Sequence, residues 1–149
     1  MDEDEEAPRA AIVGLSGLEL TSAERKIFAR TKPLGAIVFA RNIDNQRQLS
    51  DLAVEFRLAI GRHDAPILID QEGGRVARLR PPHWRHPPPA SVFAALYARD
   101  PVAARRAAHL NARLMAEDLT EAGISVDCAP VLDLPAPGSH AVIGDRAHG

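Results

Sequence analysis

The chain has 149 residues, of which 46% are hydrophobic, and this length and composition suit one folded domain with a buried core. A formal net charge of -2 argues against binding to nucleic acid or to anionic membranes, whereas small neutral ligands remain compatible with it. The single cysteine, Cys128, excludes an intramolecular disulfide.

The amino terminus is an acidic run, and we expect residues 1–9 to form a disordered tail. The like charges from Asp2 to Glu6 repel each other and bury nothing. A secretory signal needs positive charge followed by an apolar run, so this terminus predicts a cytoplasmic protein. No apolar stretch approaches the roughly 20 residues of a membrane-spanning helix.

From residue 10 onward, short apolar runs alternate with longer amphipathic runs, which is typical of repeated β-α units on a parallel sheet. Strands of such a sheet are covered on both faces and show little polar alternation. The predicted strands are Ala10–Leu15, Gly35–Ala40, Pro66–Asp70 and Ile124–Val131.

Three helices are predicted between these strands. Thr21 and Glu24 have capping-box spacing, which opens a helix that extends to about Arg30. The second helix ends near Gly61, and its apolar face consists of Leu49, Leu52, Ala53, Phe56 and Ile60. The third runs from about Pro101 to a stop at Gly123, with an apolar series of Ala107, Leu110, Leu114 and Leu119.

The proline-rich stretch Pro81–Pro89 cannot form regular structure. Such a run could be an interdomain linker or a ligand for an SH3-like domain. It lies between a predicted strand and a helical pattern that continues the same rhythm, so we prefer a stiff loop over the carboxyl ends of the strands.

Periodicity leaves two α/β architectures open. Four β-α units fit an open doubly wound domain or the front half of an eight-stranded barrel, which needs about 250 residues. Residues 14–17, Gly-Leu-Ser-Gly, match neither a dinucleotide-binding fingerprint nor a phosphate-binding loop, so no cofactor is predicted.

The densest polar cluster follows the third predicted strand, in residues 70–80. Strand ends of this kind face the ligand crevice in parallel α/β folds, and sugars need both carboxylate acceptors and guanidinium donors. The neighbouring glycines, Gly73 and Gly74, permit positive φ or close backbone approach, which would let the loop turn over a bound ring. A structural ion-pair network of Asp70, Glu72, Arg75 and Arg78 is the alternative from composition alone.

The segment Ile-Asp-Gln-Glu-Gly-Gly-Arg-Val at residues 69–76, followed by Arg78, resembles the signature of bacterial family 3 glycoside hydrolases. Further resemblances cover the chain from Ile12 onward, at residues 35–42, 89–91, 129–133 and 143–146. The most similar subgroup is the single-domain β-N-acetylhexosaminidase of cell-wall recycling. The resemblance implies an α/β fold, with residues 10–149 forming the amino-terminal half of a TIM-like (β/α)8 barrel.

By motif position, the resemblance implies that Asp70, Arg78 and Arg146 bind N-acetylglucosamine of a muropeptide or similar sugar substrate. Glu72 belongs to the scaffold of the loop. Asn42 and Asp133, at other strand ends, are expected to cap neighbouring structure more than to line the crevice.

No catalytic residue is expected within this chain. The family forms a covalent glycosyl-enzyme on an Asp, with a His-Asp pair as acid and base. The family's Lys-His-Phe-Pro-Gly-His-Gly segment would come after the end of this chain, which we therefore expect to be inactive alone. His148 is expected to have a surface role.

No metal site is predicted. His83 and His86 are two ligands on a proline-rich loop, which is an incomplete zinc site, and His63, His109 and His140 have no partner pattern. Cys128 lies inside an apolar run and is expected to be a buried, inert thiol.

Two alternatives remain open. One is a stand-alone, non-catalytic half-barrel that binds sugars, and the other is a β-glucosidase of the same family. A half-barrel would leave its first and fourth strands as edges with exposed apolar faces, which favours association or misfolding of the isolated chain.

Overall fold

The structure is a computed structural model that describes residues 7–134, 138 and 142–148. The acidic run of residues 1–6, together with His140 and Gly149, lies outside the described residues. No described helix is long and apolar enough to cross a membrane. Contacts divide the chain into two units, one of residues 1–68 and 122–126 and the other of residues 69–121 and 127–149.

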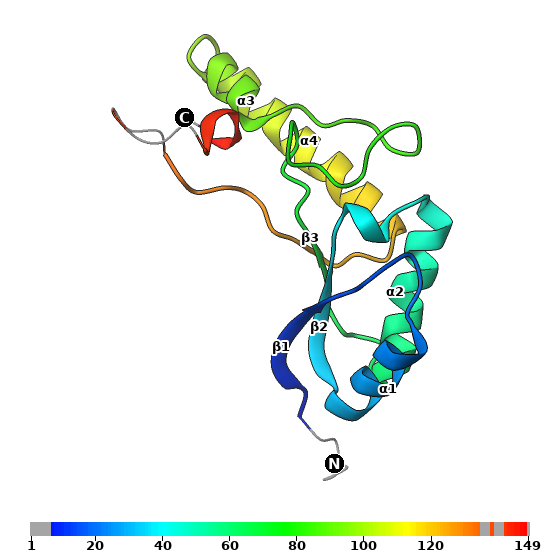
Figure 1. Ribbon diagram of the computed structural model, residues 1–149. Coiled ribbons are helices and arrows are strands. Elements are labelled where there is room, and N and C mark those ends of the chain that lie inside the picture. Colours follow the sequence, from blue (N-terminus) through cyan, green and yellow to red (C-terminus); the bar gives the residue numbers. More distant parts are fainter. Residues whose placement is uncertain (1–6, 135–137, 139–141, 149) are drawn as a thin grey trace, which may run out of the picture. The chain divides into compact units, whose positions relative to one another are not determined.

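Four strands, joined by helical connections, form a single sheet in the order β1-β2-β3-β4 (Figure 1). The strands are β1 (Arg9–Gly14), β2 (Pro33–Val38), β3 (Ile67–Ile69) and β4 (Val126–Asp127). β1 pairs with β2 in parallel. All four predicted strands are present, but the fourth has two residues where a span of eight was expected.

The prediction that every strand is covered on both faces is wrong for β1. β2 and β3 are largely buried, whereas five of the six residues of β1 are exposed. β1 has a neighbour on one side only, and among the described residues nothing covers its outward face. Leu132 and Leu134, after β4, are 86% and 74% exposed. Exposed apolar surface therefore flanks both outer strands, as expected for half of a barrel.

Two helices of the first unit cover the buried strands. They are α1 (Ser22–Thr31) and α2 (Gln46–Ile60), and a short 3-10 turn, η1 (Ala40–Asn42), precedes α2. α2 ends in the left-handed Gly61 and buries the face that its sequence predicts. The rings of Phe28 and Phe56 meet edge to face with centroids 5.6 Å apart, which joins α1 to α2 in the core.

The predicted capping box of α1 is present. The Thr21 hydroxyl accepts a hydrogen bond from the Glu24 amide at 3.1 Å, and the Glu24 carboxylate accepts from the Thr21 and Ser16 amides at 2.9 Å. Burial tends to raise the pKa of Glu24, but these hydrogen bonds outweigh it and lower the pKa to about 2. The stabilisation from this depressed pKa is therefore complete above the ordinary carboxyl pKa and is lost as pH falls towards 2.

Replacing the cap residue, Thr21→Ala, is expected to lower the free energy of unfolding by about 1 kcal/mol, because the Glu24 amide loses its acceptor. Urea unfolding followed by circular dichroism measures the change. Thr31→Ala is the matched control, since the Thr31 hydroxyl bonds only back to the Ile27 carbonyl in the last turn. Equal losses in the two variants would contradict a capping role.

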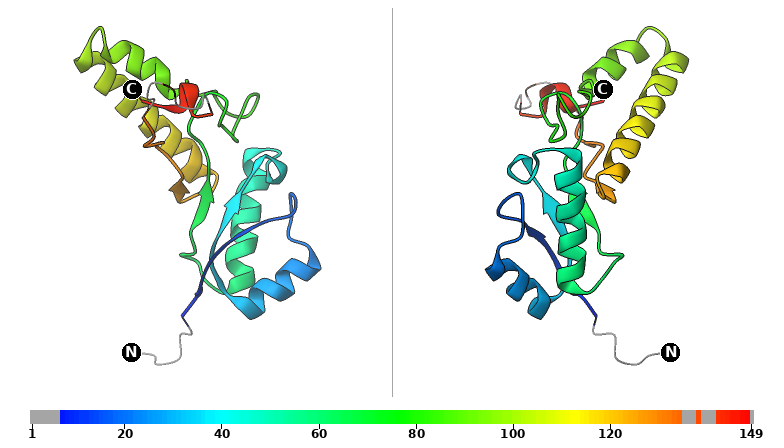
Figure 2. Two further views of the ribbon diagram at one scale, coloured as in Figure 1. Left: turned by 60° about the vertical axis from the view of Figure 1, so that its left-hand side comes forward. Right: turned by 90° about the vertical axis from the view of Figure 1, so that its right-hand side faces the viewer.

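The second unit contains a helical hairpin of α3 (Ala90–Tyr97) and α4 (Pro101–Glu121), which lie side by side in both views of Figure 2. α4 begins at the predicted proline, whereas α3 was not predicted. The predicted apolar series of α4 is wrong in part. Leu110 and Leu114 are about half exposed, and the buried residues are Ala104, Met115 and Leu119.

Candidate functional site

The loop after β3 folds back on itself in a tight turn. The amides of Glu72 and Gly73 both donate to the Val76 carbonyl, at 2.9 and 3.1 Å, and the Val76 amide donates to the Gly73 carbonyl at 3.2 Å. The turn keeps Asp70 and Glu72 at the end of the strand and directs the chain back past them.

The paired glycines of this turn lie against the proline-rich loop. Gly73 and Gly74 have φ of 99° and 55°, and the Gly74 amide donates to the Pro87 carbonyl at 2.9 Å. A Cβ on Gly73 would lie 2.3 Å from the Pro88 carbonyl oxygen, and one on Gly74 would lie 2.6 Å from the Cβ of Pro89. The glycines therefore combine positive φ with close approach, and the approach is to the proline-rich loop.

The proline-rich stretch Pro81–Pro89 contains no helix or strand, as predicted, and connects the turn to α3. The side chain of Trp84 in this stretch is buried, and Arg85 forms an ion pair with Asp118 of α4 at 3.1 Å. These contacts lie within one unit of the chain. The stretch is therefore a packed loop, which agrees with the preferred prediction and not with a free linker.

Gln71 organises the loop, and its role was not predicted. It is 3% exposed, and its side-chain oxygen accepts from the Arg78 amide at 2.7 Å and the Leu79 amide at 3.0 Å. Its side-chain amide donates to the Leu79 carbonyl at 3.1 Å. One buried amide group thus joins the two ends of the turn. A sequence signal existed, because a polar residue directly after a buried strand must find partners.

The variant Gln71→Ala is expected to lower the free energy of unfolding by roughly 2–4 kcal/mol, because three main-chain groups lose their partner in a buried loop. Urea unfolding measures it. Gln48→Ala is a matched control, since Gln48 also makes three side-chain hydrogen bonds but is only half-buried, so that water can replace them. A loss no larger than in the control would contradict the organising role.

The first predicted pair of binding residues forms an ion pair. Nη2 of Arg78 lies 2.9 Å from Oδ2 of Asp70, and each side chain is about one quarter exposed. Nε of Arg78 is buried and has no hydrogen-bond partner among the described residues. A partly exposed carboxylate next to a guanidinium group is suited to a ligand that carries hydroxyl groups.

The third predicted binding residue, Arg146, lies in the 3-10 turn η2 (Gly144–Arg146) and pairs with Glu72 in two-pronged geometry. Nε and Nη2 donate to the two carboxylate oxygens at 2.7 and 2.6 Å. These hydrogen bonds are the main cause that raises the pKa of Arg146 above its ordinary value. Glu72 therefore holds a predicted binding residue in place, which fits the scaffold role expected for it.

Arg75 provides a second connection between the turn and η2. Its Nε donates to Oδ1 of Asp145 at 3.0 Å, and its Nη2 donates to the carbonyls of Val142 and Ile143. The four residues of the predicted ion-pair network are thus all paired, in three separate pairs that include Asp145 and Arg146. The ion-pair network that composition suggested as the alternative is therefore present in this loop.

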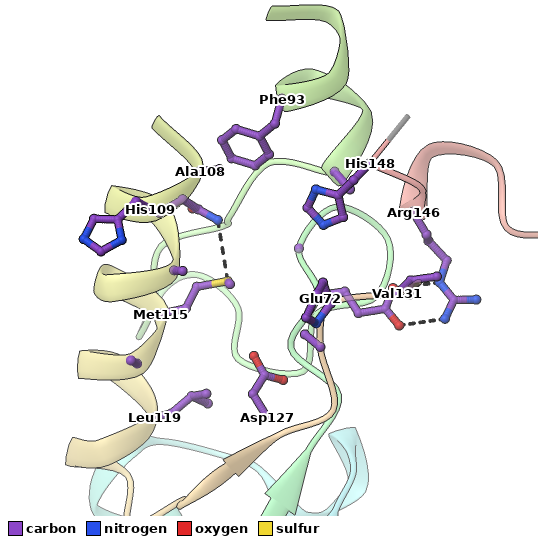
Figure 3. A pocket seen from close by; sticks show the side chains of 17 residues that line it. Glu72, Phe93, Ala108, His109, Met115, Leu119, Asp127, Val131, Arg146 and His148 are labelled. Carbon is purple, nitrogen blue, oxygen red and sulfur yellow. Dashed lines mark hydrogen bonds and ion pairs between the residues drawn. The ribbon is translucent and has the colours of Figure 1, made fainter. Parts of the chain in front are cut away.

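A cavity of about 470 Å³ opens within the second unit (Figure 3). Glu72 and Arg146 form one wall, α4 forms the opposite wall with Met115 and Leu119, and Asp127 points in from the floor. Phe93 of α3 and His148 stack with ring centroids 6.5 Å apart at its rim. Asp70 and Arg78 do not line this cavity, so the structure places one of the three predicted binding residues on its wall.

Asp127, at the end of β4, was not predicted as a site residue. Its Oδ1 accepts from the Gln71 amide at 3.0 Å. Burial raises the pKa of Asp127 to about 6, the hydrogen bond from Gln71 opposes this shift, and the nearby charges of Asp70 and Glu72 add to it. The carboxyl ends of β3 and β4 therefore bring three acidic side chains together.

Cys128 is exposed, so the prediction of a buried thiol is wrong. β4 ends at Asp127, and Cys128 follows it outside the strand. Partial desolvation of this exposed side chain raises the pKa of the thiol, as do the charges of Asp70 and Asp127 and a side-chain hydrogen bond with Asp70. A raised pKa disfavours the thiolate, which is the reactive form.

The other residues singled out from the sequence have structural or surface positions. Asn42 is fully buried and caps η1, accepting from the Phe39 amide and donating to the Leu15 and Gly17 carbonyls. Asp133 and His148 are exposed. Within residues 7–134, 138 and 142–148, no group of three or more His, Cys, Asp or Glu side chains is placed to hold a metal ion.

Comparison with known proteins identifies the family. A family model described as the glycosyl hydrolase family 3 N terminal domain matches residues 11–149. The chain therefore belongs to glycoside hydrolase family 3. Its α/β fold is the amino-terminal half of a TIM-like barrel, so the half-barrel and not the open doubly wound domain is the correct architecture.

Curated relatives are β-hexosaminidases. Those of Alkalilimnicola ehrlichii and Xanthomonas campestris pv. campestris strain B100 are 43% and 40% identical over 136 residues, which is 91% of this chain. The chain spans 38% and 40% of the length of these relatives.

Solved structures agree with this family assignment. NagZ from Neisseria gonorrhoeae in complex with N-trifluoroacetyl-D-glucosamine superposes with a TM-score of 0.86 and 33% identity, over 96% of this chain and 42% of that one. A family 3 β-N-acetylglucosaminidase from a Paenibacillus strain gives a TM-score of 0.78 and 31% identity, over 93% of this chain and 26% of that one.

Proposed function

We propose that this chain is the sugar-binding portion of a β-N-acetylhexosaminidase that removes terminal β-N-acetylglucosamine from peptidoglycan fragments. The observation that carries the proposal is the pair of carboxylate–guanidinium contacts, Asp70 with Arg78 and Glu72 with Arg146, at the end of β3. The names of the curated relatives and the N-acylglucosamine derivative bound to the gonococcal structure support it. The cytoplasmic location belongs to the same proposal.

In this proposal the three binding residues have distinct roles. Asp70 accepts hydrogen bonds from ring hydroxyls, because its carboxylate is partly open and its partner leaves room for a second contact. Arg78, whose side chain is about one quarter exposed beside Asp70, donates from its guanidinium group to a sugar oxygen. Arg146, held by Glu72, donates to a sugar oxygen through the guanidinium nitrogen that Glu72 does not bind.

The catalytic groups are proposed to come from a part of the protein beyond these 149 residues. A retaining glycosidase needs a carboxylate nucleophile and an acid/base group about 5 Å from it. The sequence of these 149 residues does not contain the Lys-His-Phe-Pro-Gly-His-Gly segment of the family. The isolated chain is accordingly expected to be inactive, and the exposed apolar residues beside β1 and β4 favour its association.

The test uses the complete protein that contains this segment, with chromogenic β-N-acetylglucosaminide and β-glucoside as substrates. Preferential hydrolysis of the first supports the proposal, and preference for the glucoside favours the alternative β-glucosidase. Titration of the isolated chain with N-acetylglucosamine tests the other alternative. Saturable binding by a monodisperse chain, with no hydrolysis by the complete protein, would establish a non-catalytic sugar-binding module instead.

A further inference from the structure

Asp127 joins the end of β4 to the end of β3 at the point where the loop of residues 70–80 begins. The Cys128 amide donates to the Ile69 carbonyl at 2.8 Å, and two residues beyond the end of β3 the Gln71 amide donates to Oδ1 of Asp127. A main-chain bond and a side-chain bond therefore connect the two strand ends within the second unit. The side-chain bond is the one that reaches the loop.

The amide that Asp127 holds belongs to the residue between Asp70 and Glu72. Fixing this amide fixes the peptide plane that joins Asp70 to Gln71, and with it the Cα atom that carries the Asp70 side chain. Glu72 is the next residue along the chain. The Gln71 side chain in turn holds the Arg78 amide at 2.7 Å. Asp127 thus supports, through one residue, both members of the Asp70–Arg78 pair and the residue that holds Arg146.

The second carboxylate oxygen of Asp127, Oδ2, has no hydrogen bond to any described residue, and the side chain points into the cavity (Figure 3). The charged groups nearest to it along the strand ends are Asp70 and Glu72, with the Cys128 thiol beside them. Arg146 of η2, His109 of α4 and His148 line the same cavity. Burial, with the charges of the acidic neighbours added to it, raises the pKa of Asp127 to about 6.

We propose that Asp127 is a positioning residue for sugar binding, which sets the placement of Asp70, Glu72 and Arg78 through the main-chain amide of Gln71. This inference rests on the proposed function, because its readout is the affinity for the sugar. It adds a residue on β4 to a binding site that motif resemblance placed on the loop after β3 and on η2.

The test compares Asp127→Ala and Asp127→Asn in the complete protein, with KM and kcat measured on the chromogenic β-N-acetylglucosaminide. Asp127→Ala removes the acceptor and is expected to raise KM about tenfold, with kcat changed less than about threefold. Asp127→Asn keeps an oxygen at the position of Oδ1 and is expected to restore KM at pH 7.5. Asp51→Asn, an exposed residue of α2, is the control and should match the wild type.

A merely structural role gives a different pattern, since loss of folded protein lowers the apparent kcat and leaves KM unchanged. The pH profile provides a second readout. A neutral carboxyl is a weaker acceptor than a carboxylate, so the wild-type KM should rise as pH falls through about 6, the pKa of Asp127. This step should be absent in Asp127→Asn.

Failure of this inference can be distinguished from failure of the proposed function. A wild-type protein that hydrolyses the substrate while both Asp127 variants keep the wild-type KM overturns the inference and leaves the proposed function intact. A folded wild-type protein that neither hydrolyses nor binds the N-acetylglucosaminide overturns both. If Asp127→Ala is not folded, Asp127→Asn decides through the pH step, whose persistence would overturn the inference.

Discussion

Asp70→Ala is expected to lower kcat/KM of the complete protein about 100-fold or more on a chromogenic β-N-acetylglucosaminide. Truncating one partner of a partly desolvated charge pair costs roughly 2–5 kcal/mol, because the lost contact also leaves the other charge unpaired. Here the remaining charge is Arg78, whose Nε already has no partner among the described residues. Steady-state kinetics of the purified variant measures the loss.

Asp64→Ala is the control for this substitution, since Asp64 is an exposed aspartate whose ion pair with Arg62 lies outside the loop after β3. It should keep wild-type kinetics. Arg78→Ala should reproduce most of the Asp70→Ala defect, and the double variant should be little worse than either single one, because the two residues act as a pair. Undiminished turnover in Asp70→Ala would contradict the assignment of Asp70 to the binding site.

Gly73→Ala should destabilise the protein by more than about 2 kcal/mol and raise KM in any protein that remains folded. The added Cβ would lie 2.3 Å from a main-chain oxygen of Pro88, and the backbone at φ 99° disfavours any L side chain. Either the turn or the proline-rich loop must move. Movement of the turn displaces Asp70, which is three residues away.

Two glycine variants separate the causes of this effect. Gly61→Ala has positive φ but open space around its Cβ, so about 1 kcal/mol is expected from the backbone alone. Gly17→Ala has open space and no positive φ, and it should be neutral. Urea unfolding of the three variants ranks them. If Gly73→Ala cost no more than Gly61→Ala, the close contact with the proline-rich loop would not matter.

Local sequence signals correctly predicted most of the helices and strands of the first unit. The capping box at Thr21 and the left-handed Gly61 each act within one helical turn, and the apolar face of α2 is complete in sequence. These features depend on neighbours a few residues away, so the pattern of the chain is sufficient to predict them. The same reasoning explains why the proline-rich stretch was correctly predicted to be a loop.

Predictions that depended on distant neighbours were less successful. The faces of β1 and the apolar series of α4 were assigned as if every apolar residue had a partner, yet β1 is an outer strand and Leu110 lies on the exposed side of α4. α3 was missed because it is short and follows the prolines directly. Burial at these positions depends on which elements pack against them. The local sequence pattern contains no information about these distant elements.

The sequence by itself determined the family and the segment that carries the candidate site, because the Ile69–Val76 motif and Arg78 are contiguous and specific. Only the tertiary structure decided how that segment is held. Gln71 is an organiser because the turn brings Arg78 and Leu79 back to it, and Asp127 matters because the sheet places β4 beside β3 across 56 residues of sequence. Hydrogen bonds between such distant residues exist only after the strands pair.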